Sequence, residues 1–129
     1  MSATGYAGGV RRLLLAAVLV AGVGHAGVPA TALAPEYAVA LPPGSVRILE
    51  SCDPQNLGYL YCYEVPGDLG DVVHAIAQQL RAAGYELRRE DATIDSVEQW
   101  WVRLDPLRFI TLDLRAEPGG VVSIVMASV

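Results

Sequence analysis

The chain has 129 residues, which allows one domain, and its formal net charge at pH 7 is −5. No lysine is present, and residues 35–129 hold seven arginines and all fourteen acidic residues, a net charge of −7. This balance excludes nucleic acids and anionic membrane surfaces as partners, because both require a basic patch.

Residues 1–34 have the layout of a secretory signal peptide followed by a leader remnant. Arg11-Arg12 precedes an apolar run over 13–23, which is about half of the roughly 20 residues that a membrane span needs. Cleavage after Ala26 and after Ala34 are both compatible with the pattern, as are the general and the twin-arginine export routes. We therefore expect a secreted or periplasmic protein without a stable membrane span after processing.

An Ala/Pro-rich tether is expected over 35–45, followed by one small domain over 46–129. The domain begins with a predicted hairpin, in which strands over 46–51 and 57–65 flank a polar turn. Its three tyrosines, Tyr59, Tyr61 and Tyr63, share one side of the second strand. Their parity favours the core, but a flipped hairpin would expose them as an aromatic platform.

Cys52 and Cys62 flank the turn of this hairpin. Because an exported chain meets an oxidising compartment, the two thiols are expected to pair. A disulfide closing so short a loop stabilises the fold by about 3 kcal/mol in the chain-entropy account. A redox role is disfavoured, because the spacing differs from Cys-x-x-Cys.

The clearest periodic element is a helix predicted over 68–83, and its apolar residues recur at helical spacing along one face. Pro66-Gly67 ends the preceding strand, Asp68 is suited to the N-cap, and Gly84 to the left-handed position after the helix. A single apolar stripe of this kind must be buried against another layer, so the helix is expected to lie on a sheet.

Strand patterns follow over 85–91, 97–104, 108–116 and 121–129, separated by turn signals. The predicted order is β-β-α-β-β-β-β, an α+β fold of two layers with one helix packed on a mainly antiparallel sheet. One helix cannot cover six strands. The opposite face of the sheet is therefore expected to be solvated, covered by the tether, or used to meet a partner.

Alternation along 97–104 predicts that Trp100 points into the core and that Trp101 and Arg103 point away from it. The same rule turns Arg115 outward on the next strand. We therefore predict Trp101, Arg103 and Arg115 as residues of a binding surface. The alternative for Trp101 is an edge aromatic packed under the tether or in a homodimer.

Catalytic signals are weak. His74 is the one histidine left after processing, no Gly-x-Ser-x-Gly elbow is present, and Asp71 with His74 makes only two potential metal ligands. We therefore expect no catalytic residues, no metal and no cofactor. The preferred interpretation is a non-enzymatic binding or interaction module of the bacterial cell envelope, with an unidentified protein or envelope component as partner. The alternatives are a small hydrolase or metal-dependent enzyme centred on His74, and an accessory domain with a purely structural role.

Overall fold

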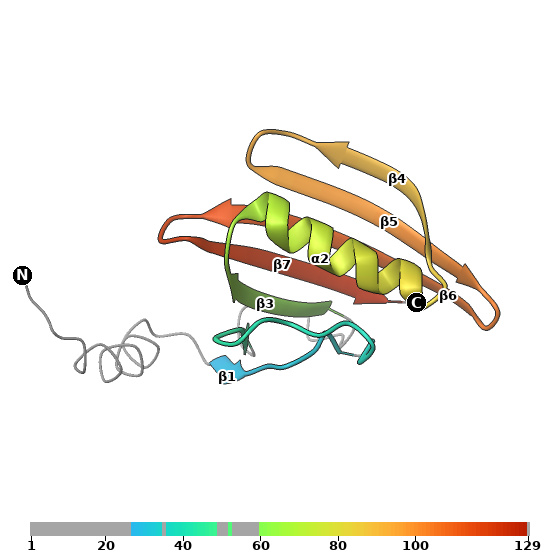
Figure 1. The fold of residues 1–129 in the computed structure, drawn as a ribbon, viewed down its shortest axis with the longest axis horizontal. Coiled ribbons are helices and arrows are strands. Elements are labelled where there is room, and N and C mark those ends of the chain that lie inside the picture. The colour runs from blue at the N-terminus through green and yellow to red at the C-terminus, as the bar shows by residue number, and fades with distance from the viewer. Residues whose placement is uncertain (1–26, 35, 49–51, 53–59, 129) are drawn as a thin grey trace, which may run out of the picture.

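The computed structural model describes residues 27–34, 36–48, 52 and 60–128 of the chain. Seven strands form one sheet in the order β1-β2-β3-β7-β6-β5-β4, and every neighbouring pair is antiparallel (Figure 1). The elements are β1 (Gly27–Pro29), β2 (Val46–Ile48), β3 (Leu60–Pro66), α2 (Leu69–Ala82), β4 (Glu86–Ala92), β5 (Ser96–Leu104), β6 (Leu107–Glu117) and β7 (Val121–Ser128).

The general class predicted from the sequence, one helix on an antiparallel sheet, is confirmed. The strand order differs in detail, because β1 adds a strand before the predicted hairpin. After β3, helix α2 crosses the sheet to β4 at the opposite edge, and the β4 to β7 meander returns until β7 pairs with β3 (Figure 1). The expected strand residues 49–51 and 57–59 lie outside the described part of the chain.

Helix α2 ends where its sequence predicts. The Asp68 carboxylate accepts a hydrogen bond from the backbone N–H of Asp71 at 3.3 Å, which caps the first turn. Gly84 has a φ of 94°, the left-handed conformation that stops a helix at low steric cost. Val72, Ile76 and Leu80 are buried on the face toward the sheet. In the described residues, no helix combines the length and apolarity that crossing a membrane requires.

The segment expected to be a leader remnant and tether is packed onto the fold. We call residues 30–34 and 36–45 the strap. Leu33 and Val39 in the strap are fully buried in the same core as α2. Gln79 of α2 holds the strap through the main chain of Ala40, accepting from its N–H at 2.7 Å and donating to its carbonyl at 3.1 Å. The strap therefore forms part of the layer that covers the sheet.

Strand β6 follows the predicted alternation, with Ile110, Leu112 and Leu114 buried. On β3, Tyr63 is buried and Tyr61 packs against the core, so the core placement is confirmed for these two tyrosines. The Tyr63 hydroxyl accepts a hydrogen bond from the backbone N–H of Ala34 in the strap at 2.8 Å. Tyr59 lies outside the described residues.

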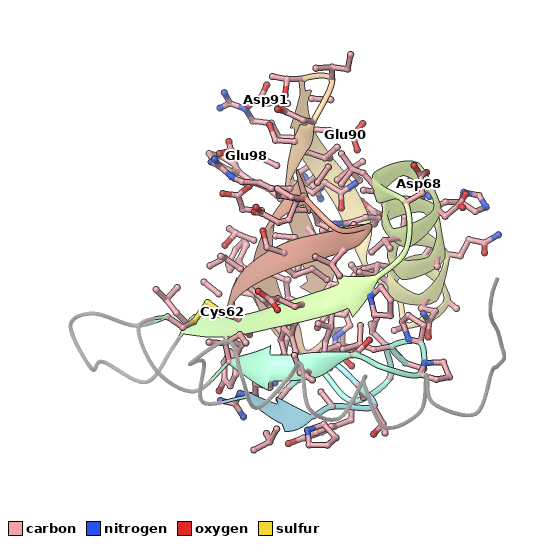
Figure 2. The ribbon with its side chains drawn as sticks, turned by 90° about the vertical axis from the view of Figure 1, so that its left-hand side faces the viewer. Cys62, Asp68, Glu90, Asp91 and Glu98 are labelled. Atoms are coloured by element: carbon pink, nitrogen blue, oxygen red, sulfur yellow. A yellow bond between two sulfur atoms is a disulfide. The ribbon has the colours of Figure 1, made fainter. Side chains whose placement is uncertain are left out.

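The predicted disulfide between Cys52 and Cys62 is present. Cys62 lies on β3 directly opposite Val125 of β7. Its side chain is therefore on the side of the sheet away from the helix, as Figure 2 also shows. The bridge fixes the chain before β3 to this strand.

Candidate interaction surface

The two faces of the sheet differ in what covers them. Helix α2 and the strap lie on one side, which we call the covered face. On the other side, the far face, no described element packs, and Glu98 and Asp91 point into the open there while Asp68 lies with the helix (Figure 2). The far face is thus the face that we expected the single helix to leave uncovered.

The predicted orientation of the two tryptophans is wrong. Trp101 is 1% exposed and packs in the core of the covered face, whereas Trp100 is 50% exposed. The pairing explains the reversal, since Trp101 lies directly opposite Ile110, a core residue of β6, and cross-strand partners share a face. Trp100 lies opposite Thr111 and therefore belongs to the far face.

Polar groups around Trp101 make its burial possible. The Trp101 indole N–H donates to the Gln99 side-chain oxygen at 3.0 Å, and the Gln99 amide donates to the Glu90 carboxylate at 2.7 Å. The Arg81 guanidinium of α2 lies 5.3 Å from the centre of the Trp101 ring, within cation–π range. The Trp101 indole N–H and the Gln99 side-chain amide thus have partners, which removes the desolvation penalty that unpaired groups would carry.

Arg103 also lies on the covered face, contrary to the prediction. Its guanidinium stands 4.9 Å from the centre of the Tyr85 ring and 3.9 Å from the Glu36 carboxylate of the strap. The Tyr85 hydroxyl donates to the same carboxylate at 2.7 Å. Burial, reinforced by this hydrogen bond, raises the pKa of Tyr85 to about 12. The three side chains fasten the strap to β4 and β5.

Arg115 is the one predicted site residue that lies on the far face. It is exposed, and its guanidinium pairs with the Asp113 carboxylate at 3.4 Å. The hydrogen bond to Asp113 raises the pKa of Arg115 above its usual value. The structure therefore does not bring Trp101, Arg103 and Arg115 together on one surface.

A sequence signal for the true orientation exists in the turn between β5 and β6. Leu104 and Leu107 pair directly, so only two residues connect the strands. A two-residue turn fixes the register, and counting back from it sets Trp101 opposite Ile110. Combining that count with the alternation of β6 would have assigned Trp101 to the core.

The far face carries a contiguous group of exposed apolar side chains, which we call the aromatic patch. It comprises Trp100, Leu104, Leu107 and Phe109, whose exposed fractions run from 48% to 66%. Two open hollows flank Trp100. One of about 290 Å³ is lined mainly by β5 and β6 near their hairpin, and one of about 330 Å³ is lined by β3, β5, β6 and β7.

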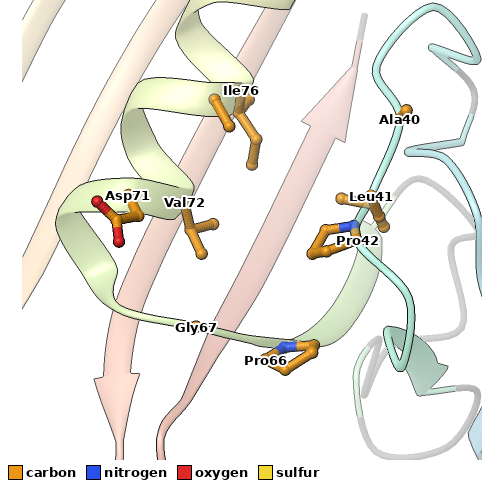
Figure 3. A pocket seen from close by; sticks show the side chains of 9 residues that line it. Ala40, Leu41, Pro42, Pro66, Gly67, Asp71, Val72 and Ile76 are labelled. Carbon is orange, nitrogen blue, oxygen red and sulfur yellow. The ribbon is translucent and has the colours of Figure 1, made fainter.

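A larger groove of about 420 Å³ lies on the covered side, between the strap and the first turns of α2. Its walls are apolar, with Leu41 and Pro42 on one side and Val72 and Ile76 on the other (Figure 3). Asp71 is its one charged lining residue, and Figure 3 shows this carboxylate turned away from the strap. The groove therefore lacks the converging polar groups that orient a ligand.

His74 is exposed on the outer side of α2, as is Asp71 one turn earlier. Within the described ranges, no three His, Cys, Asp or Glu side chains are grouped closely enough to hold a metal ion. The aromatic patch is consequently the most distinctive surface of the molecule. Comparison with known proteins gives no further guide, because no family model, no curated protein and no solved structure matches this chain.

Proposed function

We propose that this protein is a non-enzymatic binding module of the cell envelope that captures a protein or another envelope component through its far face. The observation that carries the proposal is the half-exposed pair of aromatic rings, Trp100 at 50% and Phe109 at 48%, on a regular sheet surface. Aromatic side chains supply large contact areas at binding sites, and exposed apolar groups of this size commonly mark them.

The rigid support of the patch favours a binding role. Val102 lies between Trp100 and Leu104 on β5, opposite Phe109, and is only 5% exposed. The patch stands on the two longest strands of the sheet, which pair over all 9 residues of β5. A surface held this firmly loses little conformational entropy when a partner binds.

Export is part of the proposal. The leader pattern over 1–34 directs the chain out of the cytoplasm, and the Cys52–Cys62 disulfide is compatible with an oxidising compartment. Secreted and periplasmic destinations, and the general and twin-arginine routes, are all consistent with these features.

The proposal is tested by affinity capture from envelope extracts, with the exported protein as bait. The amount of partner captured by the Trp100→Ala/Phe109→Ala double variant should fall by about tenfold or more, because the central aromatic residues of an interface dominate its binding energy. Partners are identified by mass spectrometry, and thermal unfolding verifies that the variant is folded.

The matched control is Tyr37→Ala, which removes an aromatic side chain that is 75% exposed on the strap. Capture by this control should equal that of the wild type. Equal capture by the double variant, or a wild-type bait that retains nothing specific, would contradict the proposal.

A further inference from the structure

The far face is apolar at one end and acidic at the other. Near the β5–β6 hairpin it presents the aromatic patch, as described above. Toward the opposite end of the same strands, Glu98 lies directly opposite Asp113, and Asp91 lies opposite Glu98 from β4. Three carboxylates therefore stand side by side across three neighbouring strands, and Figure 2 shows two of them, Asp91 and Glu98, projecting from the far face.

The arginines on and beside this face are already paired. Arg88 lies 3.4 Å from Glu86, Arg89 lies 3.1 Å from Asp91, and Arg115 lies 3.4 Å from Asp113. Among the described residues, the remaining far-face carboxylates, Glu64, Glu98 and Glu117, have no ion pair within 4.0 Å. The far face thus keeps an excess of negative charge.

Trp100 joins the two ends of the surface. It lines both hollows. The hollow of about 290 Å³ is also lined by Leu104, Leu107 and Phe109, and the hollow of about 330 Å³ is also lined by Glu98 and Asp113. The Arg89 guanidinium stacks 4.8 Å from the centre of the Trp100 ring, so this ring already holds one cation. A second cationic group entering the acidic hollow would meet the Glu98 carboxylate, which has no ion pair among the described residues, the Asp113 carboxylate, which is shared with Arg115, and the edge of the Trp100 ring.

We propose, building on the proposed function, that the far face binds a cationic amphipathic segment of a partner protein. The segment places apolar side chains on the aromatic patch and basic side chains beside Glu98. Charge complementarity selects this occupant over a second copy of the chain, because residues 35–129 carry a net charge of −7 and two copies would repel each other.

The test uses three tryptophan-free peptides with identical leucines and with arginine, glutamine or glutamate at the other positions. Binding is followed by the fluorescence of the protein's two tryptophans, of which Trp100 is the exposed one, and by amide NMR shifts of β5 and β6 in the full exported protein. The arginine peptide should bind at least about tenfold more tightly than the glutamine peptide, and the glutamate peptide more weakly still. Its affinity should fall as salt shortens the Debye length from about 30 Å to about 3 Å.

Two variants locate the effect. Glu98→Gln/Asp113→Asn should weaken the binding of the arginine peptide by about tenfold and leave the affinity for the glutamine peptide unchanged. Asp71→Asn removes a carboxylate from the helix side and is the matched control, which should bind like the wild type.

The outcomes separate this inference from the proposed function. If the glutamine peptide binds the far face as tightly as the arginine peptide, the surface is a binding site but the cationic partner is wrong. Far-face shifts that appear with protein concentration alone would identify a second copy as the occupant and overturn the inference. If no peptide perturbs the far face, the inference is also wrong, while the capture experiment judges the proposed function independently.

Discussion

Trp100 and Trp101 are neighbours in the chain, yet they lie in opposite environments. Trp101 has its indole N–H bonded to Gln99 and its ring beneath Arg81 of the helix, and is 1% exposed. Trp100 stacks with Arg89 on the far face and keeps half of its surface exposed. Of two identical side chains, one is therefore packed in the core, and the other is half exposed on the far face.

This difference shows that the polarity of the side chains does not identify the covered face of this sheet. Gln99 and Arg103 lie on the covered face, where each has a partner, whereas Leu104 and Phe109 lie on the far face. The polar groups of the covered face make internal contacts, while the far face keeps exposed apolar side chains and, at Glu98, a carboxylate that has no ion pair among the described residues. The predictions below exploit this division.

The largest effect should come from removing residues 27–34, which form β1 and the beginning of the strap. A chain that begins at Gly27 keeps Leu33 and Ala34, whereas one that begins at residue 35 loses both. Leu33 is fully buried, and its loss alone costs about 2 to 5 kcal/mol; losing the Ala34 bond to Tyr63 adds about 1 to 3 kcal/mol.

The longer chain should therefore be more stable by about 3 to 8 kcal/mol in guanidinium unfolding. Of the two predicted cleavage points, the one after Ala26 preserves the fold, so mass spectrometry of the exported protein should find Gly27 at its N-terminus. Equal stability of the two chains would mean that β1 and strap residues 30–34 are dispensable to the covered face.

The two tryptophans provide the second contrast. Trp101→Ala should lower the free energy of unfolding by about 3 to 5 kcal/mol, because it leaves a cavity and removes the donor to the Gln99 side-chain oxygen. Trp100→Ala should lower it by less than about 1 kcal/mol, as expected for an exposed site. Denaturant titration of both variants measures this difference, and similar losses would show that Trp100 also supports the core.

The third effect concerns alkaline pH. The pKa of Tyr85 is about 12 in the folded protein, against an ordinary value of 10.0. Its contribution to stability is therefore complete below pH 10 and is lost as the pH rises toward 12, a decline of about 2 to 3 kcal/mol.

Tyr85→Phe should flatten this part of the stability curve, measured by guanidinium unfolding at closely spaced pH values from 8 to about 12. Tyr63, whose pKa burial also raises, remains in both proteins and serves as the common background. A curve equally steep in the variant would assign the alkaline loss to other groups.

Most elements of the fold could be predicted from the sequence. Helix α2 carries both a cap at Asp68 and a stop at Gly84, and strand β6 alternates cleanly, so local chemistry and burial agree there. The Cys52–Cys62 pair followed from the cysteine spacing and from the predicted export signal. These features depend on neighbours in the chain, which a single sequence displays directly.

The candidate surface was harder to predict, because β5 has apolar residues on both faces and alternation alone cannot orient it. Its true orientation depends on pairing with β6, a contact between strands. The packing of the strap into the core was not predicted, for a related reason. Leu33 and Val39 are separated by polar and small residues with no regular period, and their burial depends on a core built by distant segments.

The contact between Gln79 and Ala40 sets unequal constraints on its two residues. Both atoms that Gln79 touches on residue 40 belong to the main chain, so any amino acid other than proline supplies the same donor and acceptor there. Position 40 is therefore free to diverge among descendants of this sequence, whereas position 79 needs a side-chain amide of the right length.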